Sequence, residues 1–207
     1  VFAKAFKKRQ VFPVLGVSAL KGVGCDYLMD FLSSYAPSPV ETSVQATRKG
    51  TDETLELQAD PAARVAALVF KTTSDPFVGK LSFVRMYSGK VAHEIYNGTK
   101  DVSEKVGGLF HMTGKKQEPA DEGIAGDIVV ISKLVHTATN DTISTRDMPL
   151  ELAPIVFSPP LLMRSLKPKT RADDDKLSST LSRLKEEEPA VVIDKNAETH
   201  ETILSGL

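Results

Sequence analysis

Three features are scarce in this sequence of 207 residues, and each scarcity excludes a class of protein. A single cysteine, Cys25, excludes an internal disulfide framework and is typical of a reducing compartment. The longest apolar runs, residues 65–70 and 128–131, are far too short to cross a bilayer as helices. Neither sign of charge dominates, because the sequence has 26 lysines and arginines and 27 aspartates and glutamates. Any surface that attracts nucleic acid must therefore be local.

Spaced metal ligands and a catalytic triad are also missing. The histidines have neither the i, i+4 spacing of metal ligands nor an accompanying CxxC motif, so each is expected to be a surface or strand residue. Cys25 is expected to be a small buried hydrophobe on a helix. No Ser-His-Asp arrangement stands out. The four histidines are His93, His111, His136 and His200.

The composition is that of a globular chain, with 41% hydrophobic and 26% charged residues. Its length is enough for one large or two to three small domains. The chain opens on Val1 with basic residues but no apolar segment of a signal peptide behind them. We therefore expect a cytoplasmic protein and a chain cut from a longer one.

Residues 1–39 have the pattern of the end of an α/β domain. The apolar, β-branched run 11–17 predicts a buried strand, and a small glycine-containing loop follows over 18–24. Apolar residues then recur every three or four positions, which predicts a helix from Val23 to Tyr35. The Pro-Ser-Pro sequence at 37–39 ends that helix, because proline cannot continue its hydrogen bonds.

A polar connector is predicted over residues 40–60, and an antiparallel β-barrel or sandwich over 61–150. Short apolar segments recur there between turns rich in glycine and asparagine, which is typical of small all-β domains. The predicted strands are 63–70, 79–87, 91–96, 106–112 and 126–135.

Residues 151–207 predict a strand, a helix and two further strands. Thr170 and Asp173 form a capping pair at the start of the helix, leucines supply its apolar stripe, and Pro189 ends it. This order is three quarters of a split βαβ-βαβ domain. The acids at 186–188 sit unfavourably at the negative end of the helix, so a nearby positive group is expected.

The run FKTTSDPFVGKLSFVRMYSG at residues 70–89 is basic and predicts two half-buried strands around a turn. Such cations can neutralise phosphates, although a solvated strand face is the alternative explanation. Between residues 71 and 100, two acids, Asp75 and Glu94, stand against five basic residues: Lys71, Lys80, Arg85, Lys90 and Lys100.

This run, with GKKQEP at 114–119 and AGDI at 125–128, closely resembles the β-barrel domain that follows the GTPase domain in the elongation factor G family. PVLGVSALKGVG at 13–24 is similar to the last guanine-binding motif of translational GTPases. The similarity implies that Ser18, Ala19 and Leu20 line the base, chiefly through backbone N–H groups. The family usually has an aromatic residue where Leu20 stands. Residues 167–207 resemble the next, ferredoxin-like domain of the family.

The resemblance implies a mixed, multi-domain fold. It consists of a strand–helix remnant of an α/β GTP-binding domain (1–39), a β-barrel (61–150) and an incomplete ferredoxin-like α+β domain (151–207). It implies a parent that uses GTP and Mg²⁺ and couples GTP hydrolysis to movement of tRNA and mRNA on the ribosome. The implied partners are ribosomal RNA and proteins directly and tRNA and mRNA indirectly, with no membrane. The implied RNA- or ribosome-binding residues, for which a solvated surface is again the alternative, are Lys71, Lys80, Arg85, Lys90, Lys167, Lys169 and Arg171.

Hydrolysis itself is not expected of these residues. The sequence contains no GxxxxGK[ST] phosphate loop, and the DxxG and NKxD motifs of the family are also missing. We therefore predict that this stretch does not bind GTP tightly. Two alternatives stay open: a stand-alone RNA- or ribosome-binding barrel without nucleotide chemistry, and a recycling, protection or other paralogue. The SALKG loop argues against the stand-alone barrel, while GKKQEP and HTATNDTIS favour the paralogue group.

Overall fold

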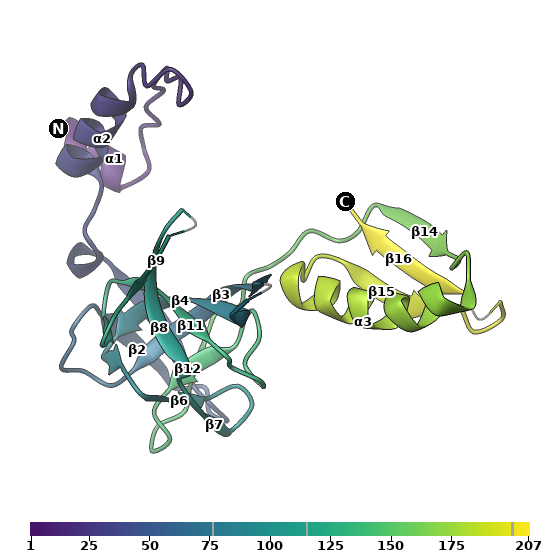
Figure 1. Ribbon diagram of the computed structural model, residues 1–207. Helices are drawn as coiled ribbons and strands as arrows, with labels where there is room; N and C mark the ends of the chain where they lie inside the picture. The colour runs from purple at the N-terminus through teal and green to yellow at the C-terminus, as the bar shows by residue number, and fades with distance from the viewer. Residues whose placement is uncertain (76, 115, 200) are drawn as a thin grey trace. The chain divides into compact units, whose positions relative to one another are not determined.

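The computed structural model divides the chain into two compact units, Val1–Thr42 and Ser43–Leu207 (Figure 1). It describes residues 1–75, 77–114, 116–199 and 201–207, without the side chains of Ala172 and Asp175. Three residues that carried sequence predictions lie outside the described residues: Pro76, Lys115 and His200.

The first unit is a pair of helices joined by a long irregular segment. Helix α1 (Phe2–Lys7) was not predicted, whereas α2 (Cys25–Tyr35) confirms the predicted helix with a start two residues later. The helices meet through aromatic edges, with ring centroids 5.2 Å apart for Phe6 and Phe31. Neither helix contains a fully buried residue, so few contacts hold this unit together. Cys25 itself is half-buried.

The strand predicted over residues 11–17 is not a strand in the structure. A strand needs a neighbour for its backbone N–H and C=O groups, and within the described residues 1–42 this segment has no ladder partner. The lone bridge nearby joins Ser18 and Val23. As a result Phe12 and Val14 remain 79% and 96% exposed.

An eight-stranded, curved antiparallel sheet forms the predicted barrel. Its strand order is β7-β6-β12-β3-β4-β11-β8-β9, and the short strands β5 and β10 pair with each other. The strands are β3 (Ala66–Asp75), β4 (Gly79–Ser88), β5 (Lys90–Val91), β6 (Glu94–Asn97), β7 (Val102–Lys105), β8 (Gly108–Thr113), β9 (Lys116–Pro119), β10 (Gly123–Ile124), β11 (Ile128–Ser132) and β12 (Thr142–Ser144).

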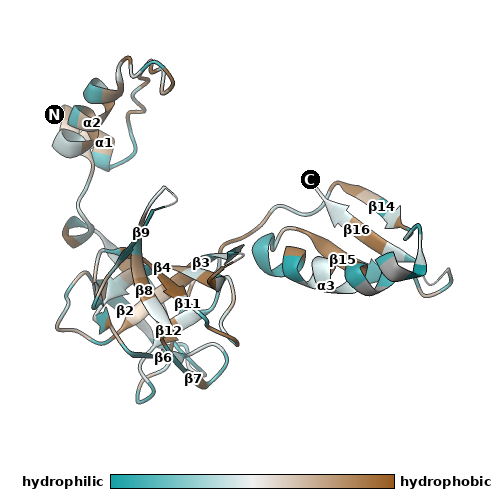
Figure 2. Cartoon of the chain, viewed as in Figure 1, coloured by the Kyte–Doolittle hydropathy of each residue, from teal (hydrophilic) through white to brown (hydrophobic). Residues whose placement is uncertain are grey.

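The core lies on the inner side of this sheet, where alternate residues of each strand converge. In Figure 2 the strands around β11 are mostly brown, whereas the loops around β6 and β7 are mostly teal and white. The members of this core that are less than 2% exposed include Val84, Met86, Val129, Ile131 and Ile143. Burying each such side chain contributes roughly 1.5–3 kcal/mol, so this core is the main source of stability.

Residues 40–60 are not simply a connector, which corrects the sequence prediction. They contain a short 3₁₀ helix (Pro39–Glu41) and strands β1 (Ser43–Arg48) and β2 (Thr54–Gln58). Together with β13 (Leu150–Leu152) these strands form a three-stranded sheet in the order β13-β1-β2. A second core joins this small sheet to the barrel, since Ala46 and Leu150 pack with Leu68 of β3.

The last part of the chain has the predicted α+β order. Strands β14 (Leu162–Leu166), β15 (Val192–Lys195) and β16 (Thr202–Gly206) pair in the order β14-β16-β15, beside helix α3 (Arg171–Glu187). The Thr170 hydroxyl accepts a hydrogen bond from the Asp173 N–H, and the carboxylate of Asp173 accepts one from the Thr170 N–H. This reciprocal capping confirms the predicted helix start. None of the described helices is long and apolar enough to cross a membrane.

The predicted positive groups near the acids at the end of α3 are present. Lys80 of β4 lies 3.6 Å from the carboxylate of Glu186, and Arg183 lies 3.9 Å from that of Glu187. The backbone N–H of Ser74 in β3 also donates to Glu187, at 3.1 Å. These contacts offset the unfavourable position of the acids in the helix dipole.

Candidate nucleic-acid interface

The loop predicted to contact guanine is a turn that leads into α2. The N–H of Ser18 donates to the carbonyl oxygen of Val23 at 2.9 Å and closes the turn. Ala19 and Leu20 lie exposed at its tip, Leu20 with 98% of its surface free. Within the described residues the N–H groups of Ala19 and Leu20 make no backbone hydrogen bond, so both are available to a carbonyl oxygen of a ligand.

Gly24 fixes the geometry between this turn and the helix. Its φ of +75° lies in the left-handed region that side chains other than glycine rarely adopt. A Cβ at this position would also lie 2.6 Å from the carbonyl oxygen of Gly16, which is backbone and cannot move aside freely. Both requirements explain a glycine at the N-cap, where an oxygen-bearing residue is otherwise favoured.

Replacing Gly24 by alanine should destabilise the turn and the first turn of α2 by about 2 kcal/mol, from backbone strain and the clash together. Gly22→Ala is the matched control, because Gly22 also has a positive φ (+68°) but nothing within 4 Å of its Cβ position. Hydrogen exchange of the α2 amides measures both effects. Equal loss of protection in the two variants would contradict the clash.

The turn offers backbone N–H donors but no group suited to phosphates. The exposed N–H groups of Ala19 and Leu20 suit a purine carbonyl oxygen. No GxxxxGK[ST] segment in this sequence provides the cradle that holds β- and γ-phosphates. The residues present therefore fit GTP only in part, and no catalytic step can be assigned to them.

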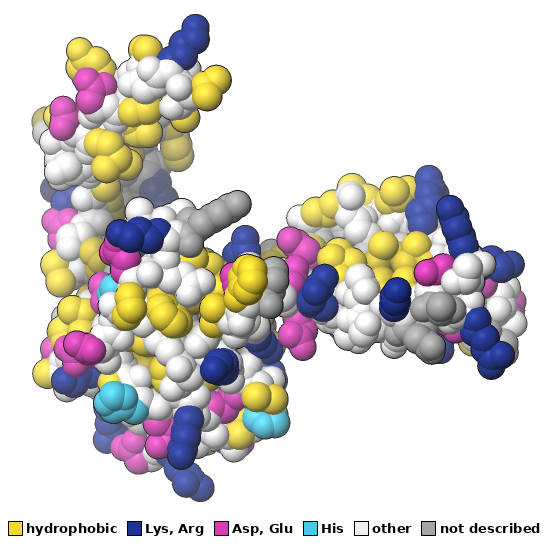
Figure 3. Space-filling model, in the orientation of Figure 1, with side chains coloured by type: hydrophobic (Ala, Val, Ile, Leu, Met, Phe, Trp, Pro, Cys, Tyr) yellow, Lys and Arg dark blue, Asp and Glu magenta, His cyan; other side chains and the backbone are white. Residues whose placement is uncertain are grey.

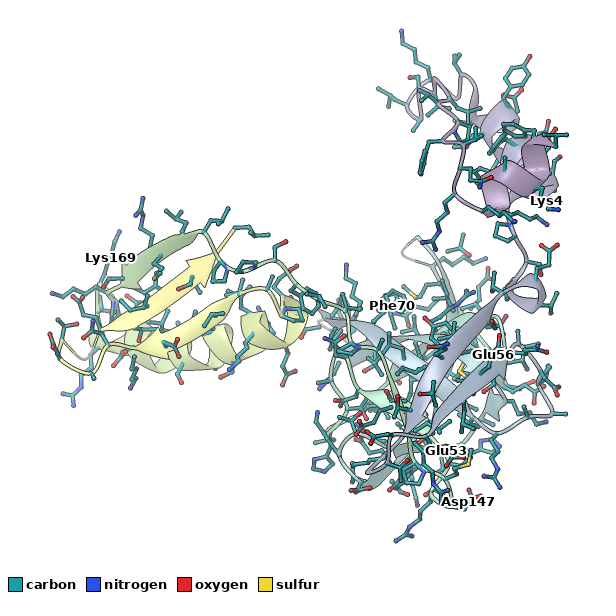
Figure 4. The ribbon with its side chains drawn as sticks, turned by 180° about the vertical axis from the view of Figure 1, so that it is seen from behind. Lys4, Glu53, Glu56, Phe70, Asp147 and Lys169 are labelled. Carbon is teal, nitrogen blue, oxygen red and sulfur yellow. The ribbon has the colours of Figure 1, made fainter. Side chains whose placement is uncertain are left out.

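The seven cations predicted to contact RNA fall into three groups. Lys71 and Arg85 lie on the outer face of the barrel sheet, on neighbouring strands. Lys80 is engaged with Glu186 and only 18% of its side chain is exposed, while Lys90 pairs with Glu122 at 3.1 Å. The remaining three are exposed at the turn between β14 and α3, where Figure 4 labels one of them: Lys167, Lys169 and Arg171.

A β-bulge determines where Lys71 points. Val69 pairs with Val84 on the core side of the sheet, and an unbroken ladder would place Lys71 on that side too. The register shifts between Val69 and Lys71, so that Lys71 pairs with Phe83 on the outer face. The bulge thus keeps a charge out of the core and sets it beside an aromatic ring.

A buried polar network, which the sequence did not reveal, connects β6 and β7 to the loop between β11 and β12. Glu104 of β7, 8% exposed, accepts hydrogen bonds from the N–H groups of Val135 and His136 and from the Thr137 hydroxyl. Burial opposes its ionisation. The hydrogen bonds from Thr137, His136 and Val135 outweigh that effect and hold the pKa of Glu104 below its ordinary value.

Asp141 is the second carboxylate of this network. It is 5% exposed and accepts from the Asn97 side-chain amide and the Ala138 N–H, each at 2.8 Å, with the Lys100 ammonium at 2.7 Å. Asn97 also donates to the Thr137 hydroxyl at 3.1 Å, which links Asp141 to Glu104. The network fixes the loop between β11 and β12.

Comparisons with known proteins agree with this architecture. A family model described as Elongation factor G domain 2 matches residues 64–146, and one described as Elongation Factor G, domain III matches residues 157–207. Proteins named elongation factor G from Ureaplasma urealyticum serovar 10 and Ureaplasma parvum serovar 3 are each 38% identical over 203 residues, covering 96% of this chain. The chain spans 29% of the length of these relatives.

A solved structure of a protein from Thermus thermophilus has a similar fold. Its TM-score is 0.73 at 21% sequence identity, over 99% of this chain and 29% of the other. The similarity at this identity concerns the fold alone.

Proposed function

Because this chain belongs to the elongation factor G family, we propose that it is the ribosome-docking part of a translation factor that couples GTP hydrolysis to movement of tRNA and mRNA. The observation that carries the proposal is the match of two successive family domains in one chain. A stand-alone RNA-binding barrel would have no reason to carry the second domain or the turn at residues 18–23. We further propose that the complete protein acts in the cytoplasm.

We propose the following division of labour. Residues 1–39 are the end of the GTP-binding domain, in which Ser18, Ala19 and Leu20 contact guanine. The barrel, with the small sheet β13-β1-β2, and the α+β part beyond it contact ribosomal RNA and ribosomal proteins. GTP with Mg²⁺ is held mainly by residues outside these 207, and rigid-body rearrangement of the domains transmits the nucleotide state.

Binding of small-subunit ribosomal RNA to the 207-residue chain tests this proposal. We expect a dissociation constant that rises steeply with salt, because cations on the chain displace counterions from phosphates. Titration with GTP should give no measurable heat. RNA binding that does not depend on salt, or tight GTP binding by this chain, would overturn the proposal.

A further inference from the structure

The outer face of the barrel carries an aromatic ladder across four strands. Lys71 of β3 pairs with Phe83 of β4, Phe83 pairs with Val130 of β11, and Val130 pairs with Phe110 of β8. One step along, Arg85 pairs with Ile128. We call these six residues the Phe83–Phe110 face. Paired residues and those two positions apart on a strand share one side of a sheet, so all six face outward.

The two rings lie on this face as platforms. Val130, between them, is only 1% exposed although it points outward, because its ladder neighbours are Phe83 and Phe110. The Phe110 ring lies over Gly108, where a Cβ would come within 2.7 Å of the ring. Phe70 supports Phe83 from the side, edge to face at 6.2 Å. Both Phe83 and Phe110 remain partly exposed.

The charge beside the rings is positive. None of the six residues is acidic, and Lys71 and Arg85 form no ion pair within the described residues. Two acids at the end of α3, Glu187 and its C-cap Glu188, line a shallow cleft with Phe70 and Lys71. They lie at the Lys71 end of the face, away from its Phe110 end.

The small sheet β13-β1-β2 leaves this face uncovered. Leu68 and Tyr87, on the same outer side of β3 and β4, are covered by that sheet in the second core. Phe83, Phe110 and Val130 belong to neither core, and Ile128 is 50% exposed. Figure 3 shows hydrophobic side chains gathered on the barrel surface where Figure 1 places β4, β8 and β11.

We propose that the Phe83–Phe110 face binds unpaired RNA bases, which stack on the two rings while Lys71 and Arg85 neutralise the adjoining phosphates. Rings bind bases of any identity, because every base has a π-face, and flanking cations favour a polyanion over an apolar protein surface. The inference rests on the proposed function, since it names the RNA feature that the barrel recognises.

Affinity for a single-stranded oligoribonucleotide of mixed sequence, compared with its duplex form, tests the stacking. Each of Phe83→Leu and Phe110→Leu should weaken single-strand binding about tenfold, because leucine fills space but offers no π-face. The salt dependence should stay unchanged. Phe77→Leu is the matched control, because Phe77 is 97% exposed in the turn between β3 and β4, off this face. Equal binding of duplex and single strand, or equal effects of the three variants, would overturn the inference.

The two cations are tested separately, through the salt dependence of single-strand binding. Lys71→Gln and Arg85→Gln should each lower the slope of log affinity against log salt by about 0.7, the value for one phosphate contact on a single strand. Arg48→Gln serves as the control, since Arg48 lies in β1, off this face, and already pairs with Glu53. An unchanged slope in all three variants would contradict phosphate contacts at this face.

A variant that leaves both rings intact tests the face even if the phenylalanine variants misfold. Ile128→Glu places a carboxylate on the half-exposed edge of the face and should weaken single-strand binding about tenfold by repulsion. Val135→Glu makes the same charge change at a residue 75% exposed in the β11–β12 loop and should leave it nearly unchanged. If ribosomal RNA binds but Ile128→Glu behaves like Val135→Glu, the inference fails while the proposed function stands. If the unaltered chain binds no RNA, both fail.

Discussion

Replacing Glu104 by alanine is expected to lower the free energy of unfolding of the barrel by about 3 kcal/mol. The substitution removes one buried carboxylate that accepts hydrogen bonds from Val135, His136 and Thr137. A buried donor that loses its acceptor costs more than the bond itself contributes, and the Thr137 side chain is fully buried. The N–H groups of Val135 and His136 lose a charged acceptor at the same time. Urea unfolding of the 207-residue chain, followed by circular dichroism, measures the change.

Two further variants separate the carboxylate from the strand that carries it. Glu56→Ala removes an exposed carboxylate from β2, which Figure 4 labels, and should leave the unfolding midpoint unchanged. Glu104→Gln keeps one acceptor oxygen. Its unfolding midpoint should therefore lie between those of the unaltered protein and of Glu104→Ala. A midpoint for Glu104→Ala equal to that of Glu56→Ala would show that the network does not stabilise the barrel.

The pH dependence of stability tests the same hydrogen bonds without shortening the Glu104 side chain. Burial opposes ionisation of Glu104, but the hydrogen bonds to it hold its pKa below the ordinary value. Its stabilisation is therefore complete at neutral pH and is lost as the pH falls through that lowered pKa. The stability difference between the unaltered chain and Glu104→Gln should accordingly narrow below about pH 4. A constant difference down to the acid transition would contradict this account.

Local periodicity was enough to predict α2, α3 and the main barrel strands, because one side of each buries apolar residues at a regular spacing. The strands β1 and β2 were missed. Their alternation of Val44 with Ala46, and of Leu55 with Leu57, is the normal signal of half-buried strands. It was overshadowed by the threonines and charges between them. The run 11–17 gave the opposite error, a strand that was predicted but is absent from the structure. An apolar pattern cannot show whether a strand has a partner.

The candidate sites depended on information that no local pattern holds. The alternation of β4 places Phe83 and Arg85 on one side, and that much could be predicted. The bulge that brings Lys71 beside Phe83 depends on the pairing of two strands. Glu104 and Asp141 have the sequence character of surface residues, yet partners 31–44 positions away bury and satisfy them. Lys80 shows the reverse case, a basic residue in a basic run that the fold pairs with Glu186.

Asp141→Ala should destabilise the barrel about as much as Glu104→Ala, again by about 3 kcal/mol. The aspartate satisfies the Asn97 amide and the Ala138 N–H, and its loss leaves Asn97, which is fully buried, with one partner fewer. Lys100 contributes little to the expected loss, because its side chain is 41% exposed and can turn to water. Asp52→Ala, in the exposed turn between β1 and β2, is the control and should leave the unfolding midpoint unchanged.

A double-mutant cycle shows whether the network acts as a unit. Asn97→Ala removes the side-chain amide that donates to both Thr137 and Asp141. In that background, Asp141→Ala therefore leaves one donor fewer without an acceptor. The combined loss in Asn97→Ala/Asp141→Ala should therefore fall short of the sum of the single losses by about 1 kcal/mol. Losses that add would mean that each residue stabilises the barrel independently. The β11–β12 loop would then be held by separate contacts, because its hydrogen bonds would not support one another through Thr137.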